Sequence, residues 1–72
     1  MKKMFVIYYE TIDDNYAFES ISEVFITDSD SILKTAEKYA SFSTVPSVII
    51  YKAKINEENG QIIPGELIKK VK

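Results

Sequence analysis

The chain of 72 residues contains no histidine, cysteine, arginine or tryptophan. Without histidine it lacks the side chain whose unperturbed pKa lies nearest physiological pH. Without histidine or cysteine it also lacks the nitrogen and sulfur ligands of zinc, thiol nucleophiles and disulfides. The absence of arginine removes the bidentate donor for phosphate and carboxylate groups. The remaining lysine, carboxylate and hydroxyl side chains form no catalytic motif, so we expect no enzyme activity, no cofactor and no metal site.

Long apolar runs and glycines are scarce as well. No stretch approaches the ~20 apolar residues of a membrane-spanning helix, so we expect no membrane association. The first residues and the apolar run 4–9 resemble the start of a signal peptide. However, the run is short, and Glu10 ends it without a small-residue cleavage site. This favours a first strand and a cytoplasmic protein. The only glycines, Gly60 and Gly65, form no phosphate-binding loop.

The apolar residues that are present are mostly β-branched, with eleven isoleucines and five valines against two leucines. Such side chains fit pleated sheets better than helices. A chain of this length folds as one domain and buries only ~60% of its unfolded surface. We expect a single α+β domain over residues 1–72, stabilised by apolar packing or by oligomerisation.

Sequence patterns predict strands at 4–9, 16–27, 46–55 and 61–63, and a helix that begins at Asp28. Ser20-Ile21-Ser22 interrupts the second of these, which predicts a bulge or a break. Asn59-Gly60 indicates a hairpin turn, and Pro64-Gly65 is expected to break the fourth strand. Residues 66–72 are predicted to form a short strand or a frayed basic tail.

This order, ββαββ, predicts an antiparallel or mixed four-stranded sheet in the order 2-1-3-4, with the helix on one face. One helix of about three turns cannot cover both faces of such a sheet, yet the run 4–9 is apolar on both. We therefore expect the chain to form a homo-oligomer, specifically a dimer. Its interface is expected to include Met4, Val6 and Tyr8, or the residues that alternate with them along the strand. Coverage of this face by the C-terminal tail is the alternative.

The charges are segregated along the chain. Residues 4–33 hold seven acidic side chains and no lysine, whereas the remainder holds four acidic side chains and all nine lysines. An acidic face raises association rates towards a basic partner, and an exposed tyrosine suits an interface. The expected residues that bind a basic protein partner are Glu10, Asp13, Asp14, Tyr16, Glu19 and Glu23. The alternative is a solvated acidic edge that prevents aggregation between sheets.

Other charged motifs indicate ordinary structure. Asp28 to Ser31 resembles the start of a calcium loop, but Ile32, Leu33 and Tyr39 stand where further ligands are needed. The terminal lysines could contact phosphate, but the net charge of −2 and the lack of arginine argue against direct nucleic-acid binding.

Residues 4–40 resemble the N-terminal module of HicB-type antitoxins over roughly half of the chain. The resemblance lies in the acidic turn Asp13-Asp14-Asn15 and in Asp28, Ile32, Ala36 and Ala40, and it implies an oligomer that neutralises a toxin. The isoleucine- and lysine-rich, arginine-free composition is typical of small genes in AT-rich genomes, including those of phages. Our leading hypothesis is an inhibitor or adaptor encoded by a phage or mobile element and acting in the host cytoplasm. The alternatives are the antitoxin-like oligomer and an oligomer that binds a small ligand.

Overall fold

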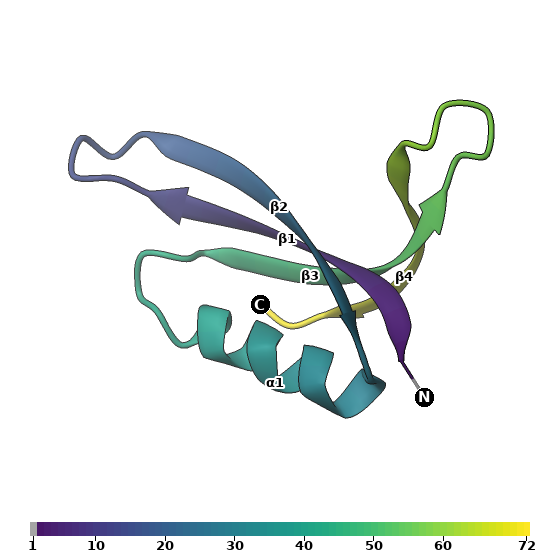
Figure 1. Cartoon of the computed structure of the whole chain (residues 1–72). Coiled ribbons are helices and arrows are strands. Elements are labelled where there is room, and N and C mark those ends of the chain that lie inside the picture. Colours follow the sequence, from purple (N-terminus) through teal and green to yellow (C-terminus); the bar gives the residue numbers. More distant parts are fainter. Residues whose placement is uncertain (1) are drawn as a thin grey trace.

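The computed structural model describes residues 2–72 and contains one four-stranded sheet and one helix (Figure 1). Every strand pair is antiparallel, and the order across the sheet is β2-β1-β3-β4. This confirms the small α+β domain and the strand order expected from the sequence. The elements are β1 (Lys3–Ile12), β2 (Phe18–Thr27), α1 (Ser29–Ala40), β3 (Ser47–Ile55) and β4 (Ile62–Lys70).

The hairpin of β1 and β2 is regular throughout, with pairs running from Lys3 and Thr27 to Ile12 and Phe18. The bulge or break expected at Ser20-Ile21-Ser22 is therefore wrong. Ser20 and Ser22 pair with residues of β1 in continuous register. Their hydroxyl side chains interrupt the apolar alternation because this part of the sheet face, around Glu10, is polar, and the backbone ladder itself continues.

Helix α1 begins where the sequence predicts. The carboxylate of Asp28 accepts a hydrogen bond from the Ser31 backbone amide at 2.7 Å and so caps the first turn. Ile32 and Ala36 lie on the buried side of the helix, one turn apart. Because Ala36 has a small side chain and no exposed surface, α1 lies close to the sheet.

Strand β4 runs continuously through Pro64 and Gly65, so the break expected there is wrong. One of the two register shifts against β3 lies beside these residues, because Tyr51 pairs with Leu67 whereas Ala53 pairs with Pro64. Proline is tolerated because β4 is an edge strand and needs fewer ladder hydrogen bonds. At Gly65 an added Cβ would lie 2.9 Å from the carbonyl oxygen of Lys52, so the close approach of β3 and β4 requires glycine.

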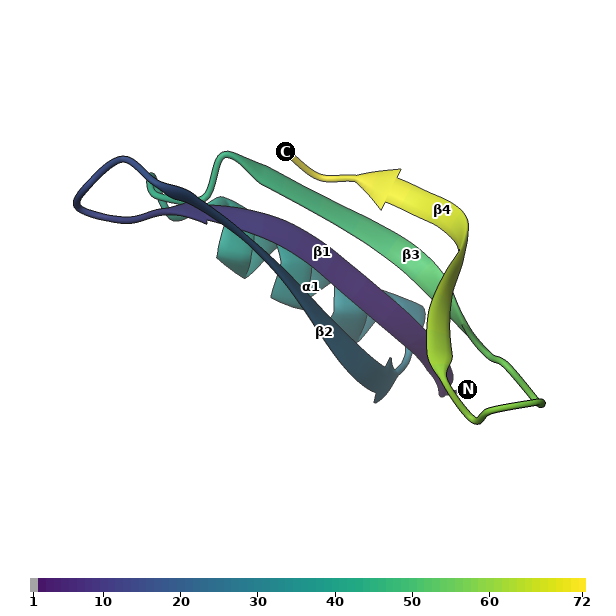
Figure 2. The same ribbon diagram turned by 90° about the horizontal axis from the view of Figure 1, so that it is seen from above.

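The core lies between α1 and one face of the sheet. Sheet residues Phe5, Ile7, Val48 and Ile50 pack there with residues of the helix and of the following loop. Seen from above, α1 lies behind the strands, and no other segment of residues 2–72 lies in front of them (Figure 2). Both hairpin ends rise away from the helix, so the twisted sheet is a saddle that is open on the side opposite α1 (Figure 1).

Candidate functional site

The sheet face opposite α1, here called the open face, is the candidate functional surface. Its residues follow from the strand register, because paired residues point to the same side of a sheet and neighbours along a strand alternate. Val6, for example, pairs with Val24 on one side and with Tyr51 on the other. The apolar side chains of the open face include Met4, Val6, Tyr8, Val24, Ile26, Ile49, Tyr51 and Leu67.

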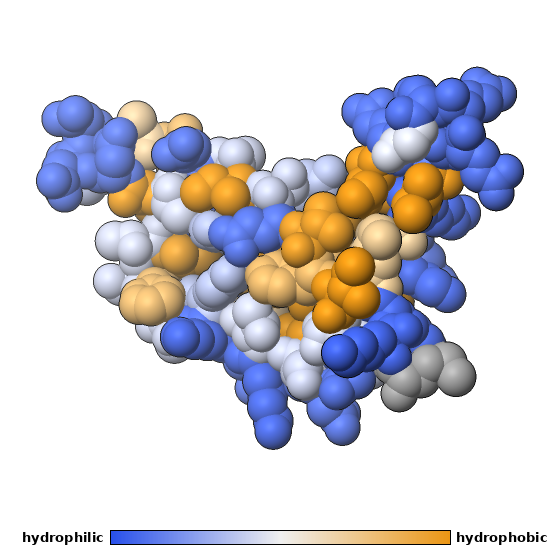
Figure 3. Space-filling view, viewed as in Figure 1, coloured by the Kyte–Doolittle hydropathy of each residue, from blue (hydrophilic) through white to orange (hydrophobic). Residues whose placement is uncertain are grey.

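The centre of the open face is tightly packed, whereas its surroundings are exposed. Val6 is only 4% exposed, although no other element lies above it. Beside it the rings of Tyr8 and Tyr51 make an edge-to-face contact with centroids 5.4 Å apart. Val24 is 46% exposed and Leu67 is 54% exposed. Apolar surface is visible between the two raised hairpins (Figure 3), which is typical of an interaction surface.

A polar band crosses the open face, between the apolar patch and the pair of Ile12 and Phe18 at the end of the first hairpin. Glu10 of β1 pairs with Ser20 of β2 and with Ser47 of β3. Lys70 lies on the same face of β4, opposite Ile49. Within the strands, the open face therefore carries one carboxylate and one ammonium group, and the apolar patch lies on the other side of this band.

The C-terminal residues do not cover the open face. Val71 packs against the core on the side of α1. The Nζ of Lys72 donates hydrogen bonds to the carbonyl oxygens of Ala40, the last residue of the helix, and of Phe42 in the following loop, at 3.0 and 3.1 Å. Residues 66–70 belong to β4. The alternative that the tail covers the second face is therefore not found among the described residues 2–72.

The structure divides the six residues predicted to bind a basic partner among three places. Glu10 lies on the open face, whereas Glu19 and Glu23 point to the opposite face of the sheet, because they pair with Thr11 and Ile7. The remaining three lie at the tip of the first hairpin: Asp13, Asp14 and Tyr16. The six residues thus do not form one continuous surface.

At the hairpin tip, Asp13 organises the turn and the neighbouring residues are displayed. Its Oδ1 accepts hydrogen bonds from the backbone amides of Asn15 and Ala17, at 2.8 and 2.9 Å. Tyr16 has a positive φ of 59°, a conformation that few residues with a side chain adopt. Its side chain is 85% exposed. Asp14 and Tyr16 are therefore the tip residues available to a partner.

Glu23 has a structural role that the sequence analysis missed. The hydroxyl groups of Tyr9 and Tyr39 donate to its two carboxylate oxygens, at 2.9 and 2.8 Å, and thereby join β1 and α1 to β2. The two rings also contact each other, with centroids 4.9 Å apart. Tyr9 lies diagonally across the hairpin from Glu23, a relation that the correct register would have revealed.

This tyrosine pair makes stability depend on pH in the alkaline range. Desolvation, followed by the hydrogen bond to Glu23, raises the pKa of Tyr39 to about 12, and the same causes raise the pKa of Tyr9. The folded protein holds these protons more tightly than the unfolded chain, whose tyrosine pKa is 10.0. Their contribution to stability is therefore complete below pH 10 and is lost as the pH rises towards about 12.

We expect the melting temperature of the wild type to fall more steeply over this alkaline range than that of Tyr39→Phe. The substitution removes the proton whose binding differs most between the folded and unfolded states. Melting curves at several alkaline pH values test this, and the ultraviolet absorbance of tyrosinate reports the titration directly. Parallel pH profiles for the two proteins would contradict the assignment.

No family model, curated protein or solved structure matches this chain. Among the described residues, no helix is long and apolar enough to cross a membrane. In the same part of the chain, no three acidic side chains lie close enough together to hold a metal ion.

Proposed function

We propose that this chain is a non-enzymatic binding protein that dimerises through its open face and presents its acidic first hairpin, β1–β2, to a basic protein, as an inhibitor or adaptor. The observation that carries the proposal is the open face itself. Within residues 2–72, apolar side chains such as Val24, Ile26 and Leu67 are exposed on that side, while the C-terminal residues pack on the other.

A second copy of the chain fits this surface in shape. A twisted sheet is a saddle, and two equal saddles fit face to face when one is turned over about a two-fold axis in the interface plane that runs along or across the strands. The strands of the two sheets then run in nearly the same direction, as in the aligned mode of sheet packing. Two-fold dimers are also the commonest oligomers.

The area and charge of the open face also suit a dimer. Four strands about nine residues long span roughly 550 Å² in projection, and the accessible surface of side chains exceeds the projected area. A standard interface takes about 800 Å² from each partner. Because Glu10 and Lys70 balance each other, two copies of the face do not repel electrostatically.

Sedimentation equilibrium of the wild type, from micromolar to millimolar concentration, tests the dimer. We expect a mass of twice the 8.2 kDa of one chain, with dissociation on dilution. A single chain mass over the whole range would overturn the proposal.

The hairpin tip supports the second half of the proposal, a basic protein partner. A shallow hollow of about 340 Å³ lies where the tip meets the loop after α1, and its lining includes Asp13, Asp14 and Tyr16. A lysine or arginine side chain could pair there with a carboxylate and lie against the exposed ring. In Figure 1 the tip projects beyond the helix.

Charge reversal at Asp14 and Glu19 to lysine is expected to slow association with the natural partner strongly, and added salt is expected to weaken wild-type binding. Asp13 is left unchanged because it organises the turn. The matched control reverses Glu57 and Glu58 in the other hairpin. Binding kinetics on the captured partner at low and high salt provide the measurement. Equal association rates for the two double variants would mean that the acidic hairpin contributes to solubility and not to partner binding.

A further inference from the structure

A groove lies on the helix side of the sheet, between α1 and β4, and the dimer proposed above leaves it free. It exists because α1 packs over β3, β1 and β2, so the β4 edge extends beyond the helix. The volume of this open groove is about 350 Å³, which falls within the ~300–1,000 Å³ range of small-molecule sites.

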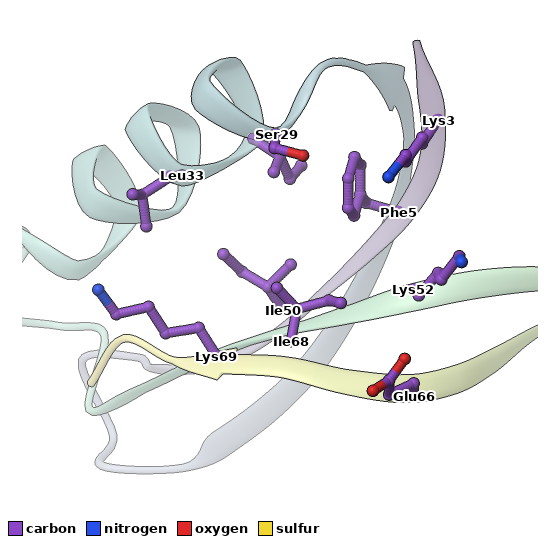
Figure 4. A pocket seen from close by; sticks show the side chains of 10 residues that line it. Lys3, Phe5, Ser29, Leu33, Ile50, Lys52, Glu66, Ile68 and Lys69 are labelled. Carbon is purple, nitrogen blue, oxygen red and sulfur yellow. The ribbon is translucent and has the colours of Figure 1, made fainter. Parts of the chain in front are cut away.

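The floor of the groove is apolar. Phe5 and Ile50 reach it from the two central strands, Leu33 from the helix and Ile68 from β4. In the close-up, Ile50 and Ile68 point into the space beneath the helix, between Leu33 and Phe5 (Figure 4). An apolar ligand of modest size would bury its surface here against side chains of four elements.

A bulge in β4 builds one wall of the groove. Ile50 pairs with Lys69 and Tyr51 pairs with Leu67, so Ile68 is an additional residue in β4 without its own partner in β3. As a result, the consecutive residues Ile68 and Lys69 both line the groove, whereas regular alternation would turn one of them away. An apolar side chain and an ammonium group are thereby placed side by side.

The rim of the groove is cationic. Lys3, Lys52 and Lys69 line it, and Glu66 is the single carboxylate among the described lining residues. Three ammonium groups around an apolar floor favour a ligand with a negative head and an apolar body. The hydroxyl of Ser29, at the start of α1, is a further donor at the rim.

We propose that this groove binds a small amphipathic anion, with its apolar body on the floor formed by Phe5, Ile50 and Ile68 and its carboxylate or similar head among the lysines. This site is independent of the open face, because Phe5, Ile50 and Lys52 point to the opposite side of the sheet. Its failure in a test would therefore leave the proposed dimer untouched, and the converse also holds.

Three ligands that share one alkyl chain test the charge and the apolar body separately. Decanoate is expected to bind, as measured by calorimetry below its micelle concentration, with amide shifts centred on Leu33, Ile50 and Ile68. Decanol is expected to bind at least tenfold more weakly, because it lacks the charge that the lysines stabilise. Decyltrimethylammonium is expected not to bind in the groove. Equal affinity for decanoate and decanol, or shifts confined to the open face, would overturn the proposal.

Variants of the rim and floor identify the site. Lys52→Gln together with Lys69→Gln is expected to weaken decanoate binding by about tenfold or more, because removing a hydrogen bond to a charged group typically changes affinity by about that factor. The matched control is Lys34→Gln together with Lys38→Gln on the helix, which removes the same charge outside the groove. Ile68→Asp places a carboxylate at a partly exposed position of the groove and is expected to abolish binding in a folded protein. Unchanged decanoate affinity in the Lys52 and Lys69 double variant, or in Ile68→Asp, would overturn the assignment.

Discussion

Val24→Asp and Leu67→Asp are each expected to convert the dimer into a folded monomer. Val24 and Leu67 lie on opposite sides of the central pair Val6 and Tyr51, and both are about half exposed in the single chain. A carboxylate at either position remains in water in the monomer, so the fold tolerates it. In the dimer the same group would be buried without a partner, at a cost of several kcal/mol. A weakening of self-association by about 100-fold or more follows.

The matched control for this experiment is Phe42→Asp. Phe42 is 52% exposed and lies in the loop after α1, where its carbonyl group accepts a hydrogen bond from Lys72. The substitution introduces the same charge in place of a comparably exposed apolar side chain but outside the open face. Sedimentation and melting curves of the three variants separate loss of association from loss of folding. A dimeric Leu67→Asp variant, or a monomeric Phe42→Asp variant, would show that the open face is not the interface.

Ile7→Ala is expected to remove a large part of the stability of the chain. Ile7 lies in the middle of β1, has no exposed surface and pairs with Ile50, beneath Ile32 and Ala36 of the helix. Truncation of such a side chain to alanine costs about 2–5 kcal/mol, because apolar surface is no longer buried and a cavity remains. A domain of this length has a free energy of unfolding of about 4–11 kcal/mol. The variant should therefore unfold at a clearly lower urea concentration than the wild type.

Urea denaturation at one fixed protein concentration measures this effect, because a dimer is more stable at higher concentration. Ile63→Ala is the matched control, since the same atoms are removed from a more exposed side chain in β4, outside the core cluster. We expect the control to cost much less than Ile7→Ala. Similar losses for both variants would mean that the buried side of β1 does not dominate the core.

Local patterns were sufficient to predict most of the fold. The apolar run of β1, the cap at Asp28 and the spacing of Ile32 and Ala36 each specify an element through interactions within a few residues. The strand order followed from chain connectivity. The course of β4 could not be predicted, because the break signalled by Pro64 and Gly65 is overridden by packing against a strand on the other side of a turn.

The candidate surfaces were predictable only in part. The sequence indicated that β1 is apolar on both faces. In the structure, Ile7 is buried on one face of β1 and Val6 on the other. The contributions of Val24 and Leu67 depend on strand register, which the composition of a strand does not reveal. The groove depends on a bulge and on the reach of the helix across the sheet, and neither has a local sequence signal.

The strand order also has a consequence for the rate of folding. The outer pairs, β1 with β2 and β3 with β4, join segments that follow each other directly in the chain, so each hairpin can form early. The central pair Ile7 and Ile50 instead joins segments more than forty residues apart. Closing that distance carries the entropic cost of a long loop before any core packing offsets it. We therefore expect the pairing of β1 with β3, with α1 folded in the connection between the two hairpins, to be the step that limits the folding rate.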